Sequence, residues 1–76
     1  MTLALQGLFG LTPAEASIAG MLANGKSTND VAVRQGITLN TARVHVKRIL
    51  AKTGTSRQAE LVALIFRSVA AMSSSG

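Results

Sequence analysis

Signals for the beginning and end of helices divide most of this sequence into short segments, and they constrain its fold more than any other feature. Thr12 is followed by Pro13 and, three residues after the threonine, by Glu15. In this pattern the threonine caps a helix, the proline takes its first position and the glutamate bonds back to the cap. Gly25 ends the segment, because glycine accepts the left-handed conformation common at helix C-termini. We therefore expect a helix from Pro13 to about residue 24.

Three further helices follow from similar signals. They are expected from about Ser27 to Gln35, from Thr38 to about Lys52, and over roughly residues 57–70. Gly36 and Gly54 separate them. Asp30 complements the positive end of the second helix, and Ser56 caps the last. No segment shows the signals of a strand. The sequence thus predicts an all-α fold, a four-helix, bundle-like domain over residues 11–70.

The two ends of the chain carry weaker signals. Residues 1–10 are apolar but hold two glycines and no strong periodicity. We interpret them as a linker or N-terminal lead-in whose Leu8 and Phe9 are able to fold back on the core. The serines of residues 71–76 indicate a flexible tail.

Composition excludes several classes of protein. The chain has no cysteine, so it has neither disulfides nor thiolate metal sites. Absence of disulfides in so small a domain favours the cytoplasm. The longest unbroken apolar run, Leu61 to Phe66, is far shorter than the ~20 residues that span a bilayer, so we expect no membrane partner.

Positive charge is concentrated in the second half of the sequence. The net charge is +5, from eight Lys and Arg against three acids. No acid lies between Asp30 and Glu60, and that interval holds six of the eight basic residues: Arg34, Arg43, Lys47, Arg48, Lys52 and Arg57. Such a basic region indicates a polyanionic partner, either nucleic acid or an anionic membrane.

The second and third expected helices have the features of a helix-turn-helix. Two helices that cross steeply over a tight turn need a small residue at the crossing, which is Ala32. They need a residue that tolerates positive φ at the turn, which is Gly36, and an apolar anchor after it, which is Ile37. Ala42 and Ile49 supply inward positions on the second of the two helices. Together, at this spacing, these residues predict a helix-turn-helix.

The outward face of the third expected helix predicts base contacts. Asn40, Arg43, Val44 and Lys47 follow one another at helical spacing, so they form one stripe. Arginine and lysine donate to guanine, asparagine pairs with adenine, and valine contacts the methyl group of thymine. The sequence therefore predicts that this helix reads the major groove of double-stranded DNA.

Other residues near this helix are candidates for phosphate contacts. Thr38 and Thr41 lie at its N-terminus, where unpaired N–H groups favour anions. Arg48, Lys52 and Arg57 fit contacts with the DNA backbone, which depend on salt and not on base sequence.

From Leu11 to about Ile65 the sequence resembles the LuxR-type (GerE-like) DNA-binding domain of bacterial transcription regulators. The matching segments are LTPAE, ANGKS, GIT, VHVK, KTG and SRQAELV. The resemblance implies base contacts for Arg43, Val44 and Lys47, and phosphate contacts around Ser27, Thr28, Thr38 and Thr41. It also implies sequence-specific regulation of transcription, with the last helix pairing two copies. Because members are usually C-terminal domains, we expect a sensory or receiver domain that is missing from this chain.

The last expected helix is apolar on nearly every side. Leu61, Leu64 and Ile65 form one stripe, and Val62, Phe66 and Val69 form another. If the first stripe packs on the domain, the second needs a cover. We favour a second copy, which makes Val62, Phe66 and Val69 a dimer interface. The alternatives are that residues 1–10 cover this stripe, or that another domain of a longer chain does.

An enzyme and a basic interaction module are the other functional classes for such a sequence. His45 has no cysteine or nearby carboxylate to work with, so we expect packing or phosphate contact and predict no catalysis, metal or cofactor. A basic interaction module for an acidic protein or a membrane surface is the main alternative to DNA binding. The last helix carries Glu60 and few basic residues, which disfavours a membrane-bound amphipathic helix.

Overall fold

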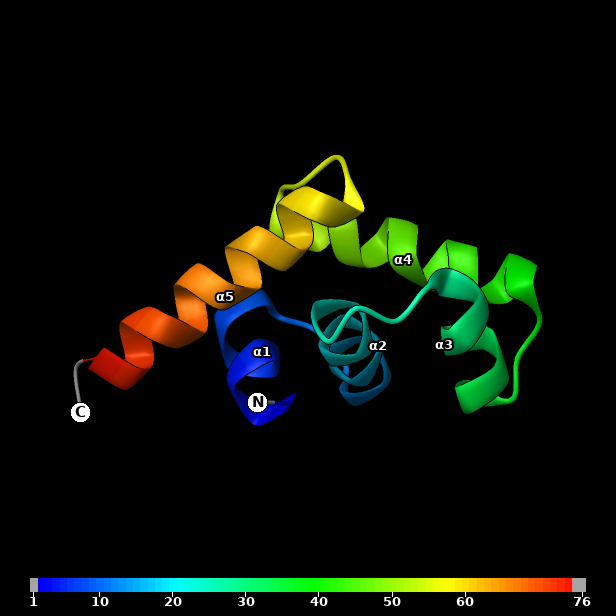
Figure 1. Cartoon of the computed structure of the whole chain (residues 1–76), viewed down its shortest axis with the longest axis horizontal. Coiled ribbons are helices and arrows are strands. Elements are labelled where there is room, and N and C mark those ends of the chain that lie inside the picture. Colours follow the sequence, from blue (N-terminus) through cyan, green and yellow to red (C-terminus); the bar gives the residue numbers. More distant parts are fainter. Residues whose placement is uncertain (1, 75–76) are drawn as a thin grey trace.

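The computed structural model describes residues 2–74, and in that range it is entirely helical (Figure 1). Five helices follow one another along the described chain: α1 (Thr2–Phe9), α2 (Pro13–Ala23), α3 (Thr28–Gln35), α4 (Leu39–Thr53) and α5 (Gln58–Ser74). Helix α2 is central and contacts each of the other four. Helix α4 lies across α2 and α3, and α5 runs back from the end of α4 past α1 (Figure 1). The predicted all-α class is confirmed.

The predicted cap of α2 is present as a capping box. The Thr12 N–H donates to Oε1 of Glu15 at 2.9 Å, and the Glu15 N–H donates to Oγ1 of Thr12 at 3.1 Å. Helix α3 has a second capping box, in which Ser27 and Asp30 exchange the equivalent bonds at 2.9 and 3.1 Å. These bonds satisfy N–H groups that a helix leaves unpaired at its start.

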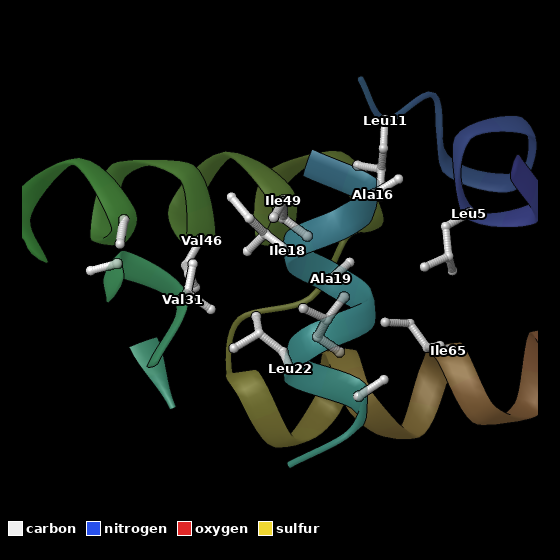
Figure 2. Close-up of a cluster of buried hydrophobic side chains, with 14 residues drawn as sticks. Leu5, Leu11, Ala16, Ile18, Ala19, Leu22, Val31, Val46, Ile49 and Ile65 are labelled. Carbon is white, nitrogen blue, oxygen red and sulfur yellow. The ribbon is translucent and has the colours of Figure 1, made fainter. Parts of the chain in front are cut away.

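The prediction of a linker over residues 1–10 is wrong. Residues 2–9 form α1, which packs on α2, and Leu5 is fully buried. Figure 2 shows the Leu5 side chain pointing toward Ile65 of α5. The sequence pattern does not predict this helix because no capping box marks its start and Gly7 lies in its interior. Its end has a glycine cap, since Gly10 has a φ of 65° and its N–H donates to the carbonyl of Gln6 at 3.0 Å. Tertiary burial of Leu5, and not local propensity, stabilises it. Of the two residues expected to fold back, Phe9 packs against the core and Leu8 is 46% exposed.

The C-terminal helix also departs from its prediction at both ends. Helix α5 continues through Ser74, so residues 71–74 of the expected tail are helical, and residues 75–76 lie outside the described range. At its start, Oε1 of Glu60 accepts the N–H groups of Ser56 and Arg57 at 3.1 and 3.0 Å. The carboxylate of Glu60, and not the hydroxyl of Ser56, therefore caps this helix.

The core is built from aliphatic side chains, many of them small. Figure 2 shows Ile18, Ala19 and Leu22 of α2 between Val46 and Ile49 of α4 on one side and Ile65 of α5 on the other. Among the residues whose side chains the structure describes, five of the fourteen buried hydrophobic residues are alanines. Alanine buries little area, so each large aliphatic residue contributes a large share of the stability of this small domain.

The turn between α3 and α4 has the predicted geometry. Gly36 adopts the left-handed conformation with φ 66° and ψ 35°. The N–H of Ile37 donates to the carbonyl of Ala32 at 3.0 Å, which closes the end of α3. Ala32 and Ala42 are both buried beside this turn, at 5% and 0% exposure. Small side chains at these positions allow α3 and α4 to approach each other, so the helix-turn-helix is confirmed.

Two glycine substitutions should change stability in opposite directions. A Cβ added at Gly36 meets no atom within 4 Å, but its φ of +66° disfavours any L side chain. We expect Gly36→Ala to lower the free energy of unfolding by about 1–2 kcal/mol. Gly7 lies inside α1, equally free of neighbours and without a positive φ. Gly7→Ala should raise the free energy of unfolding by about 0.5–1 kcal/mol. Urea denaturation followed by circular dichroism checks both, and equal effects would contradict the assigned turn.

Candidate nucleic-acid interface

Helix α4 has an inward and an outward face that differ sharply in chemistry. Ala42, Val46 and Ile49 point into the core, with exposures of 0%, 9% and 0%. The opposite face lies on the side away from α2 and α3 (Figure 1). All four residues of the predicted base-reading stripe are exposed there: Asn40, Arg43, Val44 and Lys47. The structure therefore brings these residues together on one open surface.

The charged residues of this surface are free of internal partners. Arg43, Lys47 and Arg48 are exposed and make no hydrogen bond or ion pair with the residues that the structure describes. No carboxylate occurs on α4. Val44 is 46% exposed beside them. An apolar side chain within an uncompensated basic stripe gives the surface both charge for phosphates and an apolar contact for a base edge.

The N-terminus of α4 presents several hydrogen-bond donors without an internal acceptor. Oγ1 of Thr38 accepts the N–H of Thr41 at 3.1 Å, and the Thr38 hydroxyl donates to Oγ1 of Thr41 at 2.9 Å. Since Oγ1 of Thr41 accepts this bond, its own hydrogen is free to donate outward. The N–H groups of the first two helical residues, Leu39 and Asn40, have no acceptor within the described chain. These donors point out of the positive end of the helix dipole.

The start of α3 is less favourable for a phosphate. Ser27 is exposed and its hydroxyl oxygen is already bonded to the Asp30 N–H, while Thr28 is half-buried. The carboxylate of Asp30 lies at the same helix end, and bonds from the backbone and side chain of Ser27 hold its pKa below the ordinary value of 3.8. A phosphate near Ser27 and Thr28 therefore meets a negative charge that α4 does not have.

Helix α5 buries one of its two predicted stripes and exposes part of the other. In the first stripe Leu61 and Ile65 are 0% and 1% exposed, whereas Leu64 is only half-buried. Val62 and Val69 are half-buried, and Phe66 is 58% exposed. Helix α1 covers the core near Ile65 but leaves the Phe66 ring open, so residues 2–9 do not cover the whole of the second stripe.

Comparison with known proteins identifies the domain. The profile of bacterial regulatory proteins of the luxR family matches residues 10–65. This chain belongs to the luxR family. It is 41% identical over 54 residues to the probable transcriptional regulatory protein SgaR of Hyphomicrobium methylovorum, an alignment that covers 71% of this chain and 26% of that protein. The chain thus spans about a quarter of the length of this curated relative. No solved structure matches the chain.

The luxR-family match leaves out α1 and the C-terminal part of α5. It ends at residue 65, one residue before the exposed Phe66, and it begins after the last residue of α1. The helix-turn-helix of α3 and α4 lies entirely inside the match. The features that this chain adds to the family pattern are therefore at the end of the molecule away from α3.

One predicted phosphate contact of this luxR-family domain has an internal partner. Nζ of Lys52 donates to Oε1 of Glu15 at 2.7 Å, and the Glu15 side chain is 5% exposed against 39% for that of Lys52. The same carboxylate oxygen accepts the Thr12 N–H. Glu15 therefore joins the start of α2 to the last turn of α4. Sequence reasoning missed this pair, because thirty-seven residues separate its members and no local pattern connects them.

Acid should weaken this pair and with it the domain. Burial by itself raises the pKa of Glu15, but bonds from Lys52 and Thr12 and the charge of Lys52 outweigh burial and hold it below 4.5. A carboxyl with a lowered folded pKa stabilises the fold above its unfolded pKa, and this contribution is lost as the pH falls through the folded value. We expect the free energy of unfolding to decline below about pH 4.5.

The variant Glu15→Gln isolates this contribution. Glutamine retains the capping box with Thr12 but loses the charge that faces Lys52. We expect the variant to be about 1 kcal/mol less stable at neutral pH, since Lys52 is partly exposed, and to show a smaller decline in acid. Asp30, with its own lowered pKa, accounts for the decline that remains. Urea titrations at a series of pH values test this, and identical pH profiles for both proteins would contradict it.

The remaining polar residues of the core suggest no other site. His45 is half-buried on α4 between the two faces, and its Nδ1 is buried without a hydrogen-bond partner in the described chain. No three His, Asp or Glu side chains gather within residues 2–74. None of the helices in that range is both long enough and apolar enough to cross a membrane.

Proposed function

We propose that this luxR-family domain binds double-stranded DNA in a sequence-specific manner and regulates transcription. Helix α4 enters the major groove, where Asn40, Arg43, Val44 and Lys47 contact base edges. The observation that carries the proposal is the open face of α4, on which basic side chains without internal partners surround an exposed valine. The likeness to a probable transcriptional regulatory protein supports the same assignment.

The proposed phosphate contacts differ in how strongly the arrangement of their side chains supports them. Thr38 and Thr41 have the strongest support, because their hydroxyl groups and the free N–H groups of α4 lie together at one helix end. Arg48 is exposed on α4, and Arg57 is exposed immediately before α5. Ser27 and Thr28 share their helix end with Asp30, so we assign them a weaker role. Lys52 is explained by its bond to Glu15.

A second copy of the domain completes the proposed complex. The exposed part of α5 around Val62, Phe66 and Val69 pairs two domains, and each α4 then reads one half of an inverted repeat. Half-sites in such complexes are separated by about one helical turn, or 10–10.5 base pairs, or by multiples of it. Because DNA binding in a bacterium takes place in the cytoplasm, we propose that location for the protein. We also propose that a sensory or receiver domain of a longer chain controls its binding to DNA.

Binding to an anionic membrane fits the structure less well. A helix that lies on a membrane carries basic and apolar residues on adjoining faces of one element. Here α4 carries four basic residues, but its exposed large apolar side chains are only Leu39 and Val44. Helix α5 carries the exposed Phe66, but its only basic residue is Arg67 and it also carries Glu60. The basic charge and the apolar surface are thus concentrated on different helices, which favours DNA as the polyanion.

Selection of binding sites from a randomised duplex library tests the proposal. We expect enrichment of an inverted repeat, and an affinity for it whose logarithm falls linearly with the logarithm of salt concentration. Vesicles that contain anionic lipid serve as the alternative polyanion. Failure to enrich any sequence, together with retention on vesicles, would overturn DNA recognition.

A further inference from the structure

The outward surface of α5 carries one exposed aromatic ring in a row of exposed alanines. Ala59, Ala63, Phe66 and Ala70 follow one another at helical spacing and are all exposed. Phe66 is 58% exposed and rises above the neighbouring alanines. A helix face of this kind presents a single projecting group to whatever covers it.

A groove of matching chemistry lies one turn from this ring. It has a volume of about 550 Å³ and lies between the end of α2 and the first turns of α5. Leu22, Ala23, Ala59 and Val62 form its apolar walls, and Lys26 and Gln58 lie at its edge. Val62 therefore belongs to the groove, while Phe66, four residues further along the same stripe, stands outside it.

We propose that two copies of α5 pair antiparallel about a two-fold axis beside residue 64, so that Phe66 of each copy fills the groove of the other. The inference rests on the proposed pairing of two domains through α5 and adds its register. In a two-fold interface the contact of one residue with another occurs twice. An axis midway between Val62 and Phe66 therefore places the Phe66 ring of each copy in the groove of the other.

The charges of α5 fit the same register. Glu60 and Arg67 line a second hollow, of about 350 Å³, on the other side of the alanine stripe. Their midpoint along the helix falls between residues 63 and 64, beside the axis that Val62 and Phe66 require. Antiparallel pairing thus places each Glu60 opposite Arg67 of the other copy. Such agreement between a ring, a groove and two opposite charges favours a second copy over an unrelated partner.

Both charged groups are available for this contact. Oε1 of Glu60 is bonded to the Ser56 and Arg57 N–H groups, which leaves Oε2 to accept from a neighbour. The Arg67 guanidinium has no partner among the residues that the structure describes. Arginine donates through a planar fork that suits a carboxylate.

The pairing is expected to be weak without DNA. A stable interface usually buries about 800 Å² on each partner. The surface of this chain is only 4538 Å², and one face of one helix supplies a small part of it. Two half-sites on one duplex then raise the effective concentration of the second copy.

Cysteine cross-linking measures the register directly, since the chain has no cysteine of its own. A Val62→Cys chain is mixed with a differently tagged Phe66→Cys chain at high concentration and oxidised briefly. We expect a higher yield of the mixed disulfide, between positions 62 and 66, than of either symmetric disulfide. With the axis beside residue 64, position 62 of one copy faces position 66 of the other, whereas the two copies of position 62, and of position 66, are displaced along the helix. Val33→Cys, on the exposed surface of α3, is the control and should not cross-link to either chain. The register would be wrong if a symmetric disulfide gave the highest yield. It would also be wrong if Val33→Cys cross-linked to either chain as efficiently as the two α5 variants cross-link to each other.

A DNA measurement tests the two contacts separately. Phe66→Ala and Arg67→Glu should each lower the preference for an inverted repeat over a single half-site by at least about tenfold, the loss expected for a central interface residue. Affinity for the single half-site should match that of the controls, Val33→Ala and Arg34→Glu. An unchanged preference in both variants would refute the proposed contacts. Absence of half-site binding by the unaltered protein would instead refute DNA recognition, and the cross-linking result would still decide the register.

Discussion

Arg43→Ala/Lys47→Ala should abolish most of the specific DNA affinity of this domain. Each base contact of this kind contributes about 1–3 kcal/mol of discrimination, so the double variant should bind its selected half-site about 30-fold to 20,000-fold more weakly. Both side chains are exposed on the outer face of α4, away from the core. Their removal should therefore leave the fold intact. Fluorescence anisotropy with a labelled single half-site gives the affinity, and circular dichroism checks the helical content.

Variants of basic residues outside the predicted base-contact stripe distinguish base recognition from general electrostatic attraction to DNA. Arg34→Ala/Arg67→Ala removes the same charge from outside α4 and should cause a much smaller loss on a single half-site. Arg48→Ala should weaken binding almost equally for selected and mixed-sequence duplexes, and it should reduce the salt slope by about one. If the Arg43→Ala/Lys47→Ala protein kept its preference for the selected sequence, the base-contact assignment would be wrong.

Leu5→Ala should destabilise the domain by about 2–5 kcal/mol, as expected for removal of a fully buried leucine. Leu5 is 0% exposed and points toward Ile65, so its truncation leaves a cavity where α1, α2 and α5 meet. In a domain of this size the melting temperature should fall by ~10 °C or more. Thermal unfolding monitored by circular dichroism gives the value. So large a loss is a substantial part of the stability that a small domain possesses.

Leu3→Ala is the matched control for this change. Leu3 lies on the same helix but is 83% exposed. We expect its replacement to change stability by no more than ~0.5 kcal/mol. Equal melting temperatures for Leu5→Ala, Leu3→Ala and the unaltered protein would show that α1 does not dock on α2 in solution.

Local chemistry determined the four helices that the sequence predicted. Helix caps such as Thr12 with Glu15, and helix-ending residues such as Gly36, act over three or four residues. They can therefore be recognised in the sequence without knowledge of the fold. The stripe on α4 is equally local, because helical periodicity alone brings Arg43 and Lys47 to one side. Their contact with bases remains a prediction, which the Arg43→Ala/Lys47→Ala variant tests.

Only the tertiary structure determined the remaining features. Helix α1 has no capping box at its start and has a glycine in its interior. Burial of Leu5 beside Ile65, sixty positions away in the sequence, stabilises it. Glu15 reaches Lys52 because α2 and α4 cross, which no local pattern encodes. Packing of one α5 stripe on the core decides that the Phe66 ring is exposed and that Val62 lines a groove, although both residues belong to the same predicted stripe. Short-range bonds fix where helices begin and end, whereas long-range packing selects which of their faces stay open to a partner.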